Sequence, residues 1–405
     1  MIHFFNPDHE TAVLNASKHY HPPTQVAKMQ ADLAFLPAWY AFDGDFVFME
    51  KPLPDGFLFS LEPLNFQVLP VSPHDFTEKQ EAFQHSILDL WGISPQSVHF
   101  FEELNKSDNL SLAIPPWKEE YRFLGSRFAS QKLLSRLLDR IPEVEPDIFP
   151  LFFPDIEKIE QANQQSPEPL LVKSPHSSSG RGLLRLLPGK LTQSERQIIG
   201  GMLKKQGEVS IEKLLNKQLD FSMQFENTVA GDTRFLGYSI FQTNLRGAYE
   251  KSSLDTQSCL EKQISHRIEN DLLVKTRTIL SELIHEMYAN AYHGIIGVDL
   301  LVYKTIDANR LHPCVEINMR KTMGYLAFRL AEKYLHPDSH GDFFIDYNRN
   351  PTVTGQKHDQ FQKLYPLIFE NGRIRSGYLS LCPIKEDTNY RAYVIIKERS
   401  KKYLV

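Results

Sequence analysis

The sequence predicts a mixed protein of the α/β or α+β class. The main observation is that short apolar runs typical of strands alternate along the chain with longer segments of helical periodicity. The length of 405 residues predicts two or three domains. With 41% hydrophobic and 23% charged residues, the chain has the composition of a folded globular protein, which excludes wholesale disorder.

The N-terminal part predicts a buried strand followed by irregular structure. Residues 2–5 (IHFF) form a short apolar run that ends at Asn6, as expected for a first strand that enters a loop. Prolines are frequent between positions 52 and 73, so we expect short extended pieces there. Residues 77–91 have a helical pattern that Gly92 would stop.

The adjacent prolines 115–116 are the best candidate for a domain boundary, because two prolines in a row can continue neither a helix nor a central strand. Apolar residues at helical spacing over 134–141 predict a helix that Pro142 ends. The longest helical pattern covers 262–292. Residues 378–397 return to strand-like runs, so we expect the sheet structure to continue close to the C-terminus.

The balance of charges argues against a dedicated nucleic-acid binder, since 45 basic and 50 acidic residues give a net charge of -5. No apolar run approaches the roughly 18 residues that a membrane helix needs. Polar residues appear too early in the chain for a secretory signal. The three cysteines are widely spaced, which favours a reducing compartment over a disulfide framework or a zinc site. We therefore expect a cytoplasmic enzyme with neither nucleic-acid nor membrane partners.

Residues 170–186 (LLVKSPHSSSGRGLLRL) are a candidate anion-binding segment. An apolar strand that carries Lys173 leads into a loop of serines and glycines, and a second apolar run follows. Small residues let backbone N–H groups turn toward an anion, and a lysine at a strand end can neutralise phosphate charge. The segment matches neither the Walker pattern nor the dinucleotide fingerprint. A solvent-exposed hairpin is the alternative interpretation.

Two further segments carry candidate metal ligands. Asp299 interrupts the apolar run 294–303, and a carboxylate in such a run must be paired, hydrogen-bonded or bound to a metal. In 314–320 (CVEINMR), the alternation of a strand places Glu316, Asn318 and Arg320 on one face. Carboxylate and amide oxygens are the hard ligands that Mg²⁺ prefers, and a neighbouring arginine suits phosphate. A structural salt bridge at Asp299 and a half-exposed strand with a Glu–Arg pair are the alternatives.

Residues 208–225 (EVSIEKLLNKQLDFSMQF) contain two strand-like runs that flank a polar turn, with Glu212 at the junction. Backbone groups of such a connector can hold an adenine, and Glu212 can bind the amino group or the ribose. Taken alone, the segment predicts only a hairpin.

In this order, the segments VKSPHSSSGRG, GVDLLVY and VEINMRKTMG resemble those of the ATP-grasp superfamily of nucleotide-dependent ligases, over roughly residues 120–325. The resemblance implies an N-terminal Rossmann-like domain followed by a two-subdomain ATP-grasp fold that clamps the nucleotide. We assign the first domain to 1–118, the small lid subdomain to 119–211, and the large subdomain with the metal site to 212–405.

The resemblance also implies roles for individual residues. Lys173 would bind the α- and β-phosphates, and Arg320 would stabilise the transferring phosphoryl group, which makes these two the candidate catalytic residues. Arg127 would be an ATP contact, since it stands near the place where an early lysine usually opens the family's nucleotide domain. Met319 stands where the family often has proline. The metal ligands would be Asp299, Glu316 and Asn318. The remaining ATP contacts would be a lid formed by Ser177, Ser178, Ser179, Gly180, Arg181 and Gly182, together with Glu212, Lys213 and Leu215.

The function implied by the resemblance is an ATP- and Mg²⁺-dependent (or Mn²⁺-dependent) ligase that joins a carboxylate to an amine or a thiol through an acyl phosphate. A phosphotransferase on the same fold and a non-catalytic nucleotide-binding protein are the alternatives. Candidate substrate contacts are Asn6, Glu10 and Arg246, although the loops that carry them also have the composition of ordinary surface loops. The sequence identifies neither the acceptor nor the oligomeric state.

Overall fold

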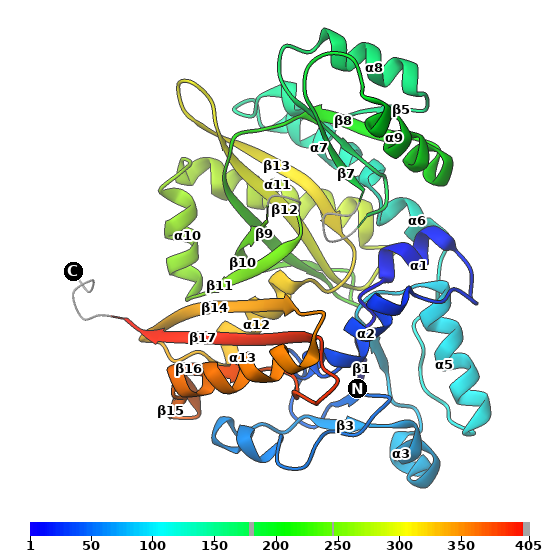
Figure 1. Ribbon diagram of the computed structural model, residues 1–405, viewed down its shortest axis with the longest axis vertical. Helices are drawn as coiled ribbons and strands as arrows, with labels where there is room; N and C mark the ends of the chain where they lie inside the picture. The colour runs from blue at the N-terminus through cyan, green and yellow to red at the C-terminus, as the bar shows by residue number, and fades with distance from the viewer. Residues whose placement is uncertain (178–181, 245–246, 400–405) are drawn as a thin grey trace. The chain divides into compact units, whose positions relative to one another are not determined.

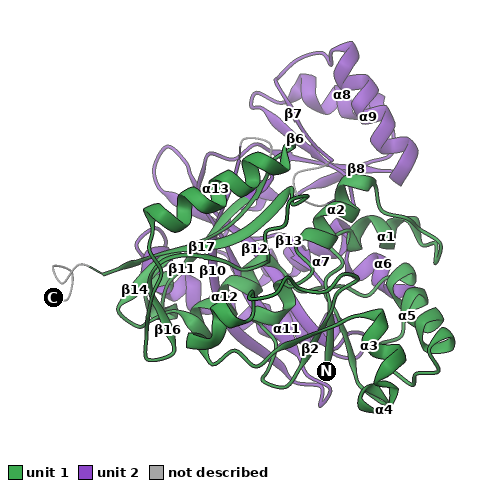
Figure 2. Ribbon diagram, turned by 60° about the horizontal axis from the view of Figure 1, so that its bottom comes forward, with its two compact units in different colours: residues 1–118, 250–260, 320–405 green, residues 119–249, 261–319 purple. Residues whose placement is uncertain are grey.

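The computed structural model describes residues 1–177, 182–244 and 247–399 (Figure 1). The chain divides into two compact units (Figure 2). Unit 1 comprises residues 1–118, 250–260 and 320–405, and unit 2 comprises residues 119–249 and 261–319. Each unit is therefore built from segments that are separated in the sequence.

Unit 1 begins with a parallel sheet in the order β3-β2-β1-β4. Its apolar side chains, among them Ile2, Phe48 and Leu90, are buried in one core with Phe101. The capping box of Ser94 and Ser97 starts α5. The elements of this part are β1 (Ile2–Phe4), α1 (His9–Asn15), α2 (Thr24–Asp32), the 3-10 helix η1 (Leu36–Trp39), β2 (Phe46–Phe48), η2 (Phe59–Leu64), β3 (Leu69–Val71), α3 (Pro73–Glu78), α4 (Gln80–Phe83), β4 (Leu88–Leu90) and α5 (Pro95–Ser107).

The helix predicted over 77–91 is wrong. The helical stretches α3 and α4 end by Phe83, and the rest of the segment contains strand β4, which pairs in parallel with β1. His85 has a positive φ of 62°, a left-handed conformation that ends the helical pattern. Leu88 and Leu90 alternate with Asp89 and are buried, so the period of this stretch is that of a strand.

The remainder of unit 1 is an antiparallel sheet in the order β11-β14-β17-β16-β15 with two helices, α12 and α13. The strand-like runs predicted over 378–397 are confirmed by β16 and β17. The buried guanidinium of Arg391 forms a two-pronged hydrogen-bonded pair with Asp346 inside this part. The elements are β11 (Tyr249–Leu254), α12 (Met323–Tyr334), β14 (Ser339–Tyr347), α13 (Pro351–Leu364), β15 (Ile368–Glu370), β16 (Arg373–Ser380) and β17 (Tyr390–Glu398). Helix α10 (Gln257–Ser265) begins in unit 1 and ends in unit 2, because the division falls after residue 260.

Unit 2 contains a small antiparallel sheet in the order β5-β8-β6-β7. Its apolar side chains pack with those of α8 and α9 in a core that includes Ile159, Val172 and Ile199. The capping box of Thr192 and Glu195 starts α9. The elements are η3 (Pro146–Ile148), β5 (Leu151–Phe153), α8 (Ile156–Gln165), β6 (Leu170–Lys173), β7 (Leu183–Leu186), α9 (Gln193–Gln206) and β8 (Val209–Lys213).

Unit 2 also contains four long antiparallel strands in the order β13-β12-β9-β10. Helix α11 packs on β9, β10 and α7, and α7 packs on β13. The helix predicted over 134–141 is confirmed by α7, whereas the pattern over 262–292 is divided between α10 and α11. The elements are α6 (Glu120–Leu124), α7 (Arg127–Arg140), β9 (Lys217–Asn227), β10 (Thr233–Thr243), α11 (Asn270–Tyr288), β12 (Gly294–Lys304) and β13 (Asn309–Asn318).

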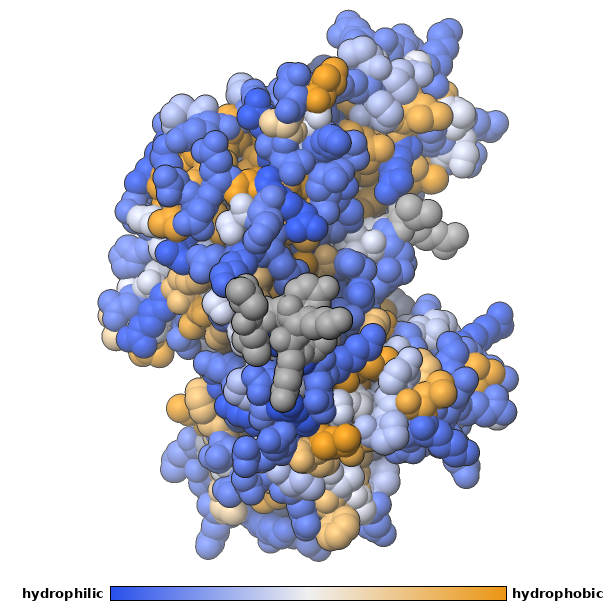
Figure 3. All heavy atoms as spheres, turned by 90° about the vertical axis from the view of Figure 1, so that its left-hand side faces the viewer, coloured by the Kyte–Doolittle hydropathy of each residue, from blue (hydrophilic) through white to orange (hydrophobic). Residues whose placement is uncertain are grey.

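Hydrophilic side chains predominate on the face shown in Figure 3, and apolar side chains lie among them in small separate groups. Within the described ranges, none of the helices has both the length and the apolar character needed to cross a membrane.

Candidate active site

Unit 2 contains a cavity of about 580 Å³, a volume typical of small-molecule sites. Part of its wall comes from the small sheet and the connector after β8, and part from the long strands β9, β10, β12 and β13. The lining includes apolar side chains, among them Leu171, Leu184, Leu215, Leu301, Val315 and Phe241. Charged groups are also part of the lining, so the cavity combines an apolar wall with groups that can bind an anion and a cation.

Lys173 is the last residue of β6 and lies almost completely buried in this cavity. Its ammonium makes an ion pair with the carboxylate of Glu212, on the neighbouring strand β8. Burial and the nearby positive charge of Lys173 lower the pKa of His312 to about 3, so this imidazole is neutral at physiological pH. Burial raises the pKa of Asp220 on β9, although Lys217, Thr243 and Lys173 partly offset that effect.

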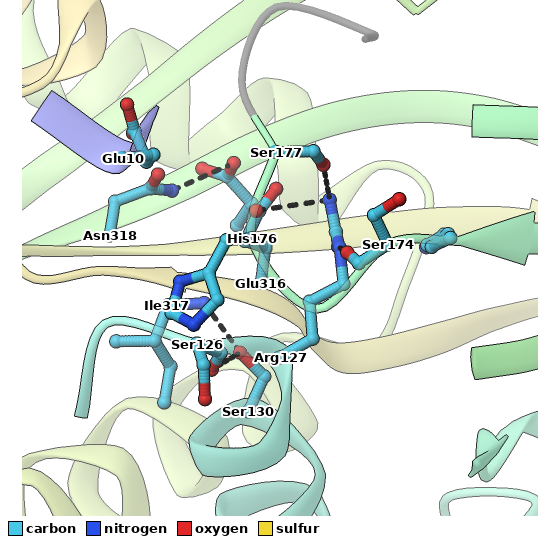
Figure 4. Close-up of polar contacts among 12 residues, drawn as sticks. Glu10, Ser126, Arg127, Ser130, Ser174, His176, Ser177, Glu316, Ile317 and Asn318 are labelled. Atoms are coloured by element: carbon cyan, nitrogen blue, oxygen red, sulfur yellow. Dashed lines mark hydrogen bonds and ion pairs between the residues drawn. The ribbon is translucent and has the colours of Figure 1, made fainter. Parts of the chain in front are cut away.

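Arg127, the first residue of α7, also lines this cavity, and its guanidinium contacts three groups (Figure 4). Its Nε donates to the carbonyl of Ser174 at 3.1 Å, and its Nη2 donates to Oγ of Ser177 at 3.3 Å. The same Nη2 lies 3.0 Å from Oε1 of Glu316 on β13. The Arg127 side chain is 9% exposed, so these contacts form in a region that is largely shielded from water.

The three predicted metal ligands lie together on β12 and β13. Asp299 and Glu316 are directly opposite each other across this antiparallel pair, and Nδ2 of Asn318 donates to Oδ2 of Asp299 at 3.2 Å. Two carboxylates and an amide oxygen fit Mg²⁺ or Mn²⁺, provided that phosphate or water oxygens complete the shell. In the described part of the chain, no group of three or more His, Cys, Asp or Glu side chains forms a metal centre, so the third protein ligand here would be the amide.

An irregularity in strand pairing accompanies these ligands. The register of β12 and β13 shifts between the pairs Asp299–Glu316 and Leu301–His312. Pro313 lies in the shifted part of β13, which is the edge strand of this set and therefore tolerates a residue without an N–H donor. Bulges of this kind change the direction of nearby side chains. Here the shift separates the acidic pair from His312 along the cavity wall.

Comparison with solved structures identifies the fold. No protein-family model and no curated protein matches the sequence. The structure is similar to that of biotin carboxylase from Campylobacter jejuni in complex with β-γ-ATP, with a TM-score of 0.51 and 14% sequence identity over 99% of this chain and 88% of that chain. The chain has the ATP-grasp fold. N5-carboxyaminoimidazole synthetase from Staphylococcus aureus complexed with ADP is also similar, with a TM-score of 0.49 and 11% identity over 97% of this chain and 92% of that chain.

The segment 208–225 connects the small sheet with the long strands. The hairpin interpretation of this segment is wrong, because β8 belongs to the small sheet and β9 to the long strands. The connector thus joins the two sheets of unit 2, and Glu212, Lys213 and Leu215 line the cavity there. Lys213 also pairs with Asp147, with Nζ and Oδ2 2.6 Å apart.

The predicted lid segment is only partly described. Strands β6 and β7 form an antiparallel hairpin, and the N–H of Ser174 donates to the carbonyl of Gly182 at 2.9 Å. Gly182 has a φ of +75°, and a Cβ there would lie 3.0–3.1 Å from side-chain atoms of Ser174 and Ser177, so a larger residue would be strained. The predicted contacts Ser178, Ser179, Gly180 and Arg181 lie outside the described residues, as does Arg246.

The other predicted site residues belong to unit 1. Arg320 follows the end of β13 and makes an ion pair with Glu10 at the start of α1. The guanidinium lowers the pKa of Glu10 despite the opposing effect of burial. The amide of Asn6 donates to the carbonyl of Gly92 at 2.7 Å and accepts from its N–H at 3.1 Å, so it fixes the loop after β1 to the loop after β4. The predicted roles of these three residues in the reaction stay predictions.

Sequence reasoning missed several residues that line the cavity, notably Asp220, Phe241, Thr243 and His312. Asp220 carried the same signal as Asp299, since it is a carboxylate inside a strand-like run (LDFSMQF). The side chains of Phe241 and Thr243 reach the cavity through strand pairing, which leaves no local mark in the sequence.

Proposed function

We propose that this protein is an ATP- and Mg²⁺-dependent ligase that joins a small-molecule carboxylate to an amine or a thiol. One observation carries the proposal: a single cavity of the ATP-grasp fold brings together a buried lysine, a buried arginine and an oxygen-rich pair of strands. Lys173 and Arg127 supply positive charge for phosphates, and Asp299, Glu316 and Asn318 supply oxygen ligands. The similar biotin carboxylase was solved with β-γ-ATP, which supports the choice of nucleotide.

The proposed reaction has two steps. A carboxylate is a poor electrophile, because expelling oxide from it is prohibitive. In the first step a carboxylate oxygen attacks the γ-phosphorus of ATP, the bond to the β–γ bridging oxygen breaks, and ADP leaves. In the second step the amine or thiol attacks the carbonyl carbon of the acyl phosphate, loses its proton and displaces inorganic phosphate.

The residues of this chain would act mainly through charge and position. Lys173 would bind oxygens of the α- and β-phosphates, and Glu212 would then bind the ribose or the adenine amino group. The apolar wall formed by Leu171, Leu184 and Leu301 suits an adenine ring. When bound to Asp299, Glu316 and Asn318, Mg²⁺ would neutralise charge that develops on the phosphates. This chemistry needs no side-chain nucleophile.

The proposal is tested by trapping the first intermediate. Incubation with ATP, Mg²⁺, hydroxylamine and a panel of carboxylic acids should yield a hydroxamate and ADP with the right acid. The Lys173→Met variant serves as the matched control for contaminating activity and should yield neither product. A phosphorylated acceptor without hydroxamate would show that the protein is a phosphotransferase and not a ligase. Failure of the protein to bind the nucleotide at all would overturn both of these functions.

A further inference from the structure

The position of Arg127 creates a conflict within the proposed site. Its guanidinium already neutralises Glu316, at 3.0 Å between Nη2 and Oε1. Glu316 is one of the two carboxylates proposed to bind the metal, and it lies opposite the other, Asp299. A divalent cation and a guanidinium repel each other, so both cannot make full use of one carboxylate in a site so poorly exposed to water.

The same guanidinium contacts the start of the loop that follows β6. It donates to the Ser174 carbonyl and to the Ser177 hydroxyl, and the N–H of Arg127 donates to the Pro175 carbonyl at 2.9 Å. The two side-chain hydrogen bonds hold the guanidinium in place independently of Glu316. Arginine suits this arrangement because its planar head carries five donors, so it can keep one set of partners while another changes, which a lysine ammonium cannot do in the same geometry.

We propose that Arg127 exchanges partners when the metal and the nucleotide bind. In the nucleotide-free protein its guanidinium is held by Glu316. When the metal binds Glu316, the guanidinium keeps its hydrogen bond to the Ser174 carbonyl and binds a nucleotide phosphate in place of the carboxylate. This inference rests on the proposed function, because it takes the cavity of unit 2 as the site of a nucleotide and a divalent cation.

The exchange predicts cooperative binding of metal and nucleotide on the protein. Without metal, a phosphate must compete with Glu316 for Arg127 and also approach the negative charges of Asp299 and Glu316. Without nucleotide, the metal must displace Arg127 and leave its charge without a partner. When both ligands bind, the metal pairs with the Glu316 carboxylate and the phosphate pairs with the Arg127 guanidinium, so neither group loses its partner. Coupling between two ligands of this kind typically changes affinity by about 5- to 150-fold.

The test is calorimetric titration of ADP into the full-length protein in the presence of a chelator, so that no metal takes part. Glu316→Gln should bind metal-free ADP about 5-fold or more tighter than the wild type, because Arg127 is released. Asp299→Asn also removes one carboxylate charge, at the position opposite Glu316 on the neighbouring strand. The ion pair of Arg127 is with Glu316 and not with Asp299. Asp299→Asn therefore serves as the matched control for repulsion alone and should gain clearly less.

A double-mutant cycle completes the test. In the Arg127→Gln background, the gain caused by Glu316→Gln should largely disappear, and Mn²⁺ alone should bind tighter than to the wild type. Arg127→Lys, which keeps the charge, is the second variant should Arg127→Gln fail to fold in thermal melts. In the Arg127→Lys background, the gain in ADP affinity caused by Glu316→Gln should shrink without vanishing. Equal gains for Glu316→Gln and Asp299→Asn, or a gain that persists in full without Arg127, would overturn the exchange while leaving the nucleotide site intact. A wild type that does not bind ADP even with Mg²⁺ would instead overturn the proposed function, and the exchange with it.

Discussion

Lys173 and Glu212 form an ion pair between adjacent strands of the small sheet, and their side chains are only 5% and 14% exposed. A buried pair of this kind leaves an uncompensated charge when one partner is removed. In the proposed function the lysine would turn to phosphate and the glutamate to ribose or adenine. The pair is thus a stable resting state of two groups that would serve different parts of one ligand.

Replacing Lys173 by Met should weaken ATP binding by about 10- to 100-fold, because a hydrogen bond to a charged group contributes about 1.5–3 kcal/mol. Met preserves most of the apolar stem, so packing should survive. Calorimetry with MgADP measures the affinity. Lys158→Met is the matched control, because Lys158 lies on the exposed face of α8 and should leave the affinity unchanged.

Lys173→Met should also lower the free energy of unfolding, because Glu212 loses its cation. Adding Glu212→Gln should restore part of the lost stability, since an amide needs no counter-charge. Urea unfolding of the single and double variants measures this. Additive losses in the double variant would show that the two side chains do not depend on each other.

Asp299→Asn and Glu316→Gln should each reduce metal-dependent turnover by at least about 100-fold, because even the loss of a group that merely supports a ligand costs 10- to 100-fold. Asp307→Asn is the control on the exposed turn between the same two strands and should retain activity. Near-normal turnover in either of the first two variants, across a range of Mg²⁺ concentrations, would remove the metal assignment.

The stability of unit 1 should fall as pH rises above about 6.5 because of His3. Burial lowers the pKa of His3, but its hydrogen bonds with Asp45 and Asp89 outweigh this effect and leave the pKa raised, against the opposing charge of Lys321. A raised pKa in the folded protein means that the protonated imidazole stabilises it at low pH. This contribution is lost as pH rises through the folded-state pKa.

Denaturation of the wild type and of His3→Gln between pH 6 and 9 checks this expectation: the wild type should lose stability over the range, and the variant should lose less. Parallel pH curves for the wild type and the variant would show that His3 does not titrate in this range.

The pKa of Asp89 is lowered to about 2, with burial opposing and Lys321 and His3 favouring the charged form. The contribution of Asp89 to stability is present above the ordinary carboxyl pKa and should be lost as pH falls toward 2.

The sequence predicted those features that depend on local patterns. Alternation along 314–320 correctly grouped Glu316 with Asn318, but it was wrong for Arg320, because β13 ends at Asn318. The loop between two apolar runs correctly placed Lys173 at a strand end. The helix over 77–91 was wrong because its apolar residues fit both periods, and the strand pairing with β1 decided between them.

Long-range contacts could not be predicted, because nothing local encodes them. Glu10 and Arg320 are 310 positions apart in the chain yet form an ion pair. The contact between Arg127 and Glu316 depends on the packing of α7 against β13. The pairing of Lys173 with Glu212 likewise required the order of strands in the small sheet, where β8 lies beside β6.

Hydrogen exchange with and without saturating MgADP tests whether the cavity of unit 2 binds MgATP. We predict slower exchange in segments 170–177, 209–217 and 312–318 when MgADP is added, and no such change in the Asp299→Asn variant at the same concentrations. Unchanged exchange in all three segments despite nucleotide binding, or protection confined to unit 1, would show that the nucleotide binds outside this cavity.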